Sequence, residues 1–100
     1  MDYQDFRRSL KSSRPPRGLS PLLRALWHDA NGEWERAHVI TATERNNTAA
    51  RVHAYLHRKE GDSDNAHYWY TRAGAERPHV SLRREWETLV RRLLEMHEQS

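Results

Sequence analysis

Residues 53–73, HAYLHRKEGDSDNAHYWYTRA, contain the signals for one complete helix, a turn and a second helix. Apolar residues recur every three to four positions on both sides of Gly61, which is the spacing of an amphipathic helix. Gly61 suits the position just after a helix, where the backbone adopts a left-handed conformation that side chains disfavour. Asp62 and Ser63 then provide oxygens that cap the free amide groups of the second helix. The stretch therefore predicts a helical hairpin.

A related stretch lies 29 residues earlier in the chain, so that Gly32 coincides with Gly61. Such self-similarity indicates repeated supersecondary units, each too small to bury its apolar face alone. The other coinciding pairs are Ala25 and Ala54, His28 and His57, Ala37 and Ala66, and His38 and His67. We therefore predict two successive helical hairpins, over residues 21–45 and 48–73.

The second hairpin resembles the tetratricopeptide (TPR) repeat, in which small residues let two antiparallel helices approach closely. The resemblance lies in the spacing of its small, turn, aromatic and terminating residues, which are Ala54, Gly61, Ala66, Tyr70, Ala73 and Pro78. It implies an all-α fold of about four hairpin helices. The first hairpin departs from the motif at Thr41 and Glu44, and the period of 29 is shorter than the usual value of about 34. The segments LWHDANGEWERAH and VHAYLHRKEGDSDNAHYWYTRAG also resemble a small family of bacterial proteins, which implies no particular activity.

The first 20 residues differ in composition from the rest of the chain. They contain five basic and two acidic residues, and the segment KSSRPPRGLS has the proline, serine and glycine content of a linker. We therefore expect residues 1–20 to form a flexible basic arm, although the spacing of Tyr3, Phe6 and Leu10 is that of a short amphipathic helix. The folded domain, residues 21–100, should begin where Ser20 and Pro21 form a helix start.

Residues 81–98 carry the most regular apolar stripe of the chain and predict a last, capping helix. Because stacked hairpins need a cap over their open end, we expect Trp86 and the leucines after it to pack on both helices of the second hairpin. The stripe includes both Leu93 and Leu94 and is wide for one small domain to cover. A homodimer is therefore possible.

Length and composition limit the class of protein. The 100 residues suit one domain of modest stability, with a net charge of +3 and no cysteine for disulfide or thiolate chemistry. No apolar run reaches the length of about 20 residues that a membrane span needs. We expect a cytoplasmic protein that does not enter membranes.

Seven histidines form the one chemical feature that stands out. His53 and His57 are one helical turn apart, as in some zinc sites, and His67 could lie at the same height on the next helix. One hypothesis is that these three, with Glu60 or Asp64, bind a zinc-like metal. The other is that the imidazoles pack and form hydrogen bonds within the hairpin, which the lack of an HExxH pattern favours.

No catalytic motif or cofactor motif is present, and the neutral domain makes nucleic acid an unlikely partner beyond weak contacts of the basic arm. The sequence therefore favours a small protein-interaction module that is not an enzyme and needs no cofactor. Large amphipathic side chains and arginine dominate binding hot spots. On this ground the candidate contact residues for a protein or peptide partner are Trp27, Trp34, Arg51, Tyr55 and Tyr68.

Overall fold

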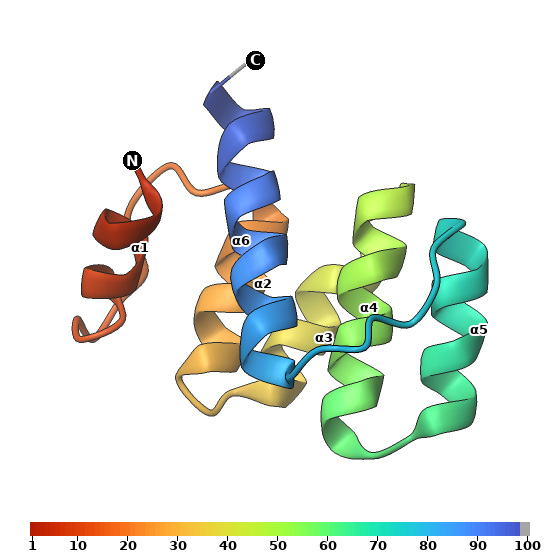
Figure 1. The fold of residues 1–100 in the computed structure, drawn as a ribbon. Helices are drawn as coiled ribbons and strands as arrows, with labels where there is room; N and C mark the ends of the chain where they lie inside the picture. Colours follow the sequence, from red (N-terminus) through yellow and green to blue (C-terminus); the bar gives the residue numbers. More distant parts are fainter. Residues whose placement is uncertain (99–100) are drawn as a thin grey trace.

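The computed structural model describes the backbone of residues 1–98 and the side chains of residues 1–96. Within residues 1–98 the fold is all-α and contains no strand, as the apolar spacing predicted (Figure 1). The helices are α1 (Tyr3–Ser9), α2 (Pro21–Ala30), α3 (Trp34–Ala42), α4 (Asn47–Glu60), α5 (Ser63–Ala73) and α6 (Leu82–Glu98).

Local chemistry sets most helix ends where the sequence predicted them. The hydroxyl of Ser20 accepts a hydrogen bond at the start of α2, and Gly61 ends α4 with a φ of 90° that only glycine adopts readily. The cap of α4 is Asn46, whose side-chain oxygen accepts from the amide of Ala49 at 2.7 Å. The expected end of the first hairpin near residue 45 was wrong. Helix α3 ends at Ala42, because the chain needs an extended conformation at Asn46 to form that cap.

The four middle helices form two hairpins, α2 with α3 and α4 with α5, and α3 also packs on α4. Small residues lie at equivalent contacts in both hairpins. Ala25 and Ala37 in the first, and Ala54 and Ala66 in the second, are all fully buried. Their small size lets the helix backbones approach closely.

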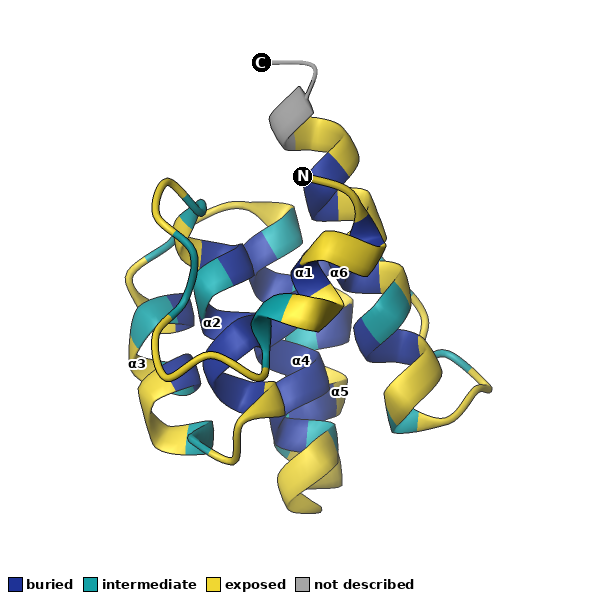
Figure 2. Ribbon diagram, turned by 90° about the vertical axis from the view of Figure 1, so that its left-hand side faces the viewer, coloured by how far each residue is buried: buried dark blue, intermediate teal, exposed yellow. Residues whose placement is uncertain are grey.

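Helix α6 does not cap the stack in the predicted way. It packs on α2 and α4, the first helices of the two hairpins, where we expected it on α4 and α5. The indole nitrogen of Trp86 donates to the carbonyl of Leu26 in α2 at 3.0 Å, which fixes α6 across both hairpins. Figure 2 shows buried residues on α2, α4 and α6. Leu93 and Leu94 are buried within the chain, so the stripe that suggested a homodimer is already covered.

Helix α1 is packed on the domain, so the expectation of a free arm was wrong for this part of residues 1–20. Phe6 is fully buried, and its ring lies 5.9 Å from that of Trp86 in α6. The Trp27 indole also donates to the hydroxyl of Ser9 at 3.2 Å. Helix α1 is too short to be stable alone, and packing of its apolar face on the protein core stabilises it.

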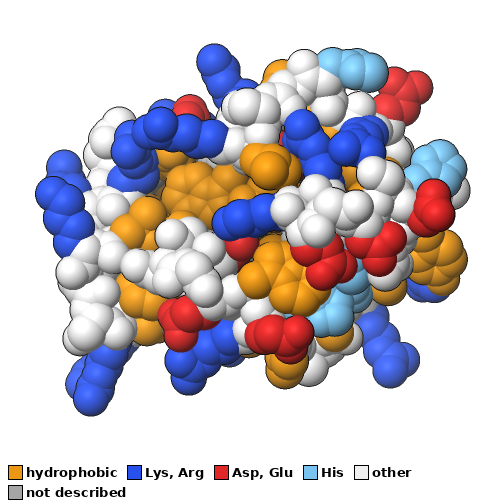
Figure 3. Space-filling model, turned by 90° about the horizontal axis from the view of Figure 1, so that it is seen from below, with side chains coloured by type: hydrophobic (Ala, Val, Ile, Leu, Met, Phe, Trp, Pro, Cys, Tyr) orange, Lys and Arg blue, Asp and Glu red, His pale blue; other side chains and the backbone are white. Residues whose placement is uncertain are grey.

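The surface of the described chain is strongly charged. Figure 3 shows the lower face of the fold, where apolar side chains reach the surface among lysine and arginine side chains.

Among residues 1–98 no helix combines the length and apolar character that crossing a bilayer requires.

Candidate metal centre

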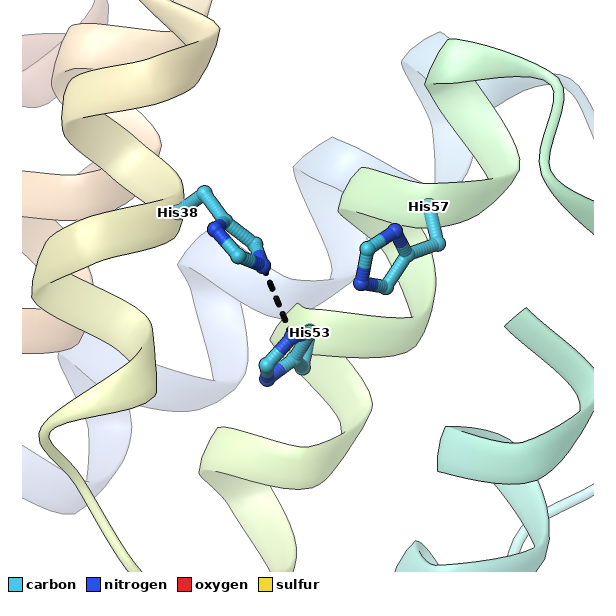
Figure 4. A group of neighbouring side chains, drawn as sticks. All are labelled: His38, His53 and His57. Atoms are coloured by element: carbon cyan, nitrogen blue, oxygen red, sulfur yellow. Dashed lines mark hydrogen bonds between the residues drawn. The ribbon is translucent and has the colours of Figure 1, made fainter. Parts of the chain in front are cut away.

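Three imidazoles converge at the contact between the two hairpins. His38 comes from α3, and His53 and His57 come from successive turns of α4 (Figure 4). The Nε2 atoms of His38 and His53 are 3.0 Å apart, and each of the three residues places one ring nitrogen within 4.8 Å of the others. The arrangement therefore brings three imidazole nitrogens close enough to be candidate ligands of one metal ion.

Helix geometry explains why these residues meet. Residues four apart lie on one face of a helix, so His53 and His57 both point from α4 toward α3. On α3 the same rule places His38 one turn after Trp34 and one position beyond the fully buried Ala37. The packing of α3 on α4 then brings the three rings together.

Two tryptophans hold the ring planes of the cluster. Trp34 stacks on His38 with centroids 4.9 Å apart and an interplanar angle of 8°, and Trp69 stacks on His53 at 3.9 Å and 9°. The indole nitrogen of Trp34 also donates to the carbonyl of Leu56 at 2.8 Å. Because stacking fixes the orientation of both imidazoles, little side-chain freedom remains to be lost on binding a ligand.

Glu60 determines which nitrogen of His57 faces the cluster. Its carboxylate lies 2.6 Å from Nδ1 of His57, and because a carboxylate only accepts, Nδ1 carries the proton. The other ring nitrogen, Nε2, points toward His38 and His53 (Figure 4). Metal-binding histidines are commonly oriented by a carboxylate in this way.

Burial keeps the other two imidazoles neutral at pH 7. Burial, together with the neighbouring His38 and His57, lowers the pKa of His53 from the ordinary value of 6.5 to about 4. Burial also lowers the pKa of His38, with a second contribution from His57. Since a metal binds the neutral imidazole, no proton has to be displaced from these two rings at pH 7.

The distance between the nitrogens of His38 and His53 is close to that in a tetrahedral centre. Zinc–nitrogen bonds of about 2.0 to 2.1 Å in a tetrahedron place the nitrogens roughly 3.3 Å apart. The spacing of 3.0 Å between His38 and His53 is near that value, and the nitrogen of His57 lies within 4.8 Å of both. Three imidazoles leave one position of a tetrahedral ion for water or another ligand.

The metal hypothesis from the sequence named two of these residues and missed the third. His53 and His57 come together, but His67 is exposed on α5 and lies outside the cluster. On that helix Ala66 and Tyr70 are buried, and a residue directly after Ala66 points about 100° away. The sequence pointed to His38 only through its match with His67 in the repeat. In the structure His38 faces α4 of the second hairpin and not the other helix of its own hairpin. Glu60 contacts His57, whereas Asp64 is exposed.

The residues expected to contact a partner have very different surroundings. Trp27 and Tyr55 are buried in the core, and Trp34 is half-buried beside the histidines. Arg51 is half-buried, and its Nε has no hydrogen-bond partner among residues 1–96. Tyr68, with 51% of its surface exposed, is the one that extends into solvent.

No protein-family model, curated protein sequence or solved structure matches this chain.

Proposed function

We propose that this protein binds a zinc-like divalent metal through His38, His53 and His57. The observation that carries the proposal is the convergence of three imidazole nitrogens, one of them oriented by Glu60. Zinc, nickel and copper accept imidazole ligands readily, whereas calcium and magnesium prefer oxygen. The metal would join α3 of the first hairpin to α4 of the second.

Calorimetric titration of the EDTA-treated protein with Zn²⁺ tests this proposal. We expect one site per chain, and stabilisation of about 2.7 kcal/mol when free zinc is 100 times Kd. His38→Gln and His53→Gln should each remove most of the zinc heat and the rise in melting temperature.

His67→Gln is the matched control, because His67 was the third ligand expected from the sequence and is exposed on α5. This variant should bind zinc like the parent. An equal loss of zinc binding in His38→Gln, His53→Gln and His67→Gln would indicate unspecific binding to surface histidines. Unchanged binding in His38→Gln would exclude the site.

We also infer that the two hairpins are TPR-like repeats. The turn glycines support this relation, since Gly32 and Gly61 have similar φ values of 80° and 90°. The histidines before them lend further support, because His28 and His57 each place Nδ1 within 3.0 Å of a glutamate oxygen. A cytoplasmic location stays a prediction from the lack of cysteine.

A role as a protein-interaction module is the second candidate function. Helix α6 packs on α2 and α4, so that face of the hairpins is not open to a partner. The supporting observation is instead on α5, where the Arg72 guanidinium lies 5.9 Å from the Tyr68 ring and 5.4 Å from the Trp69 ring. A cleft of about 320 Å³ between α3, α4 and α5 adjoins Trp69 and Arg72.

Selection of displayed peptides on the immobilised protein would test this second function. Tyr68→Ala and Arg72→Ala should each weaken binding of selected peptides at least tenfold, as hot-spot residues do. Val39→Ala, which alters an exposed side chain on α3 away from this cleft, serves as the control. Peptides that bind all variants equally would place the contact elsewhere.

A further inference from the structure

A separate hollow lies where α1, α2, α4 and α6 meet, and it has no part in the histidine cluster. Its volume is about 330 Å³, at the small end of the range of about 300 to 1,000 Å³ for small-molecule sites. The end of α2, the end of α4 and the start of α6, which border the hollow, lie at the lower side of the fold in Figure 1. Its apolar walls are formed by Tyr3, Leu10, Ala30, Leu82 and Trp86.

The hollow results from the way α1 packs on the domain. Phe6 and Tyr3 contact Trp86, so α1 is attached to α6 along one edge. Leu10 and Leu82 remain half-buried at the border of the hollow and do not fill the space toward the end of α4. Apolar surface is thus left accessible in a concave position, as is usual in ligand sites.

The negative charge within the hollow is already neutralised. Asp29 is buried, and its two carboxylate oxygens accept hydrogen bonds from Lys59 at 2.9 Å and from the Tyr55 hydroxyl at 2.8 Å. Burial, and the nearby charge of Asp29, raise the pKa of Tyr55, so this hydroxyl stays protonated. Asp29 therefore offers no free charge to attract a cation.

Two positive charges remain available. Arg7 and Arg83 line the hollow, are exposed, and form no ion pair with any residue of the range 1–96. They come from different helices, α1 and α6, so both guanidinium groups can approach one ligand. Arginine pairs with carboxylates through two parallel hydrogen bonds, which makes it well suited to this task.

We propose that this hollow binds a small apolar monocarboxylate, such as a medium-chain fatty acid. The hydrocarbon part lies against Tyr3, Leu82 and Trp86, and the carboxylate contacts Arg7 and Arg83. An acid is favoured over an amine because the hollow carries more positive than negative charge, with Lys59 already paired to Asp29. This site does not depend on metal binding by the histidines.

Titration of the full chain with octanoate tests the proposal, with EDTA present so that metal binding has no influence. Two-dimensional NMR follows the indole N–H of Trp86 and the backbone amide of Arg83. Octanoate should shift both signals in a saturable manner, whereas octan-1-ol and octylamine should bind about tenfold more weakly or not at all. Equal binding of octan-1-ol and octanoate, or no shift with octanoate, would overturn the proposal.

Paired variants separate the proposed contacts from the general effect of charge. The double variant Arg7→Gln/Arg83→Gln should weaken octanoate binding by about tenfold or more, with an unchanged melting temperature. Arg84→Gln/Arg92→Gln removes the same charge from exposed positions of α6 outside the hollow and should bind like the parent. Equal binding by both double variants, or an equal loss in both, would refute the site. Leu82→Trp fills the hollow and should abolish binding.

Discussion

The imidazoles of His38 and His53 meet with their Nε2 atoms 3.0 Å apart, although the residues are 15 positions apart and belong to different hairpins. Two neutral rings at this distance share one hydrogen bond. Protonation of both would place like charges in contact. The contact between the two rings therefore depends on pH.

The first prediction concerns pH. The pKa of His53 is about 4 in the folded protein and 6.5 in the unfolded chain, so between these values the unfolded chain binds more protons. The corresponding stabilisation is complete above about pH 6.5 and is lost as the pH falls toward 4. At about 1.4 kcal/mol per pKa unit, the loss amounts to up to about 3 kcal/mol. Urea unfolding from pH 4 to pH 8, with EDTA present, measures it.

His53→Asn should flatten this part of the pH profile, and His67→Asn, on the exposed face of α5, should leave it unchanged. A parent protein whose unfolding free energy is constant from pH 6.5 to pH 5 would contradict the prediction. An unfolding free energy that still falls steeply with pH in His53→Asn would also contradict the prediction.

The second prediction concerns Glu60. Glu60→Gln should weaken zinc binding about tenfold, because the carboxylate that orients His57 and raises its basicity is lost. The free energy of unfolding without metal should change little, since Glu60 is exposed. Calorimetry measures the affinity, and Glu76→Gln, which removes an equivalent exposed charge after α5, is the control. Identical zinc affinities for the parent and both variants would exclude a supporting role for Glu60.

The third prediction concerns Trp86. Trp86→Ala should lower the free energy of unfolding by about 3 to 5 kcal/mol, because it removes a buried indole that contacts both α1 and α2. Trp86→Phe should cost less, since the ring contact with Phe6 is partly kept and only the hydrogen bond to Leu26 is lost. Denaturant unfolding provides the values. Similar stability of the alanine variant and the parent would contradict the packing of α6.

The fourth prediction concerns α1. Phe6→Ala should destabilise the protein by about 3 kcal/mol, whereas a residue on a mobile arm would have no effect. Arg8→Ala, on the exposed side of the same helix, is the control and should change stability little. Hydrogen exchange offers a second measurement, because the Trp27 indole donates to Ser9 and should lose protection in Phe6→Ala. Full retention of stability would mean that α1 is not part of the core.

Helix ends and hairpins could be predicted from the sequence because their causes are local. Ser20 with Pro21, and Gly61 with Asp62, determine the backbone within a few residues of themselves. The position of α6 could not be predicted in this way. Its hydrogen bond from Trp86 to Leu26 joins residues 60 positions apart, and an apolar stripe does not reveal which face it will cover.

The candidate metal site was predictable in part for the same reason. His53 and His57 are related by one helical turn, which the sequence displays directly. The third imidazole depends on how one hairpin packs on the next, and this is set by side chains distributed over α3 and α4. The sequence therefore named His67 in place of His38, because helical spacing is visible in a sequence and packing between hairpins is not.

The packing of α6 across α2 and α4 also has a consequence for how the protein is made. Residues 82–98 are synthesised after both hairpins, so the nascent chain carries the hairpins before the helix that covers them has left the ribosome. Until then the apolar faces of α2 and α4 are open to chaperones and to other nascent chains. A premature stop before Leu82 would therefore yield a fragment with exposed apolar surface, which we expect to aggregate or to be degraded.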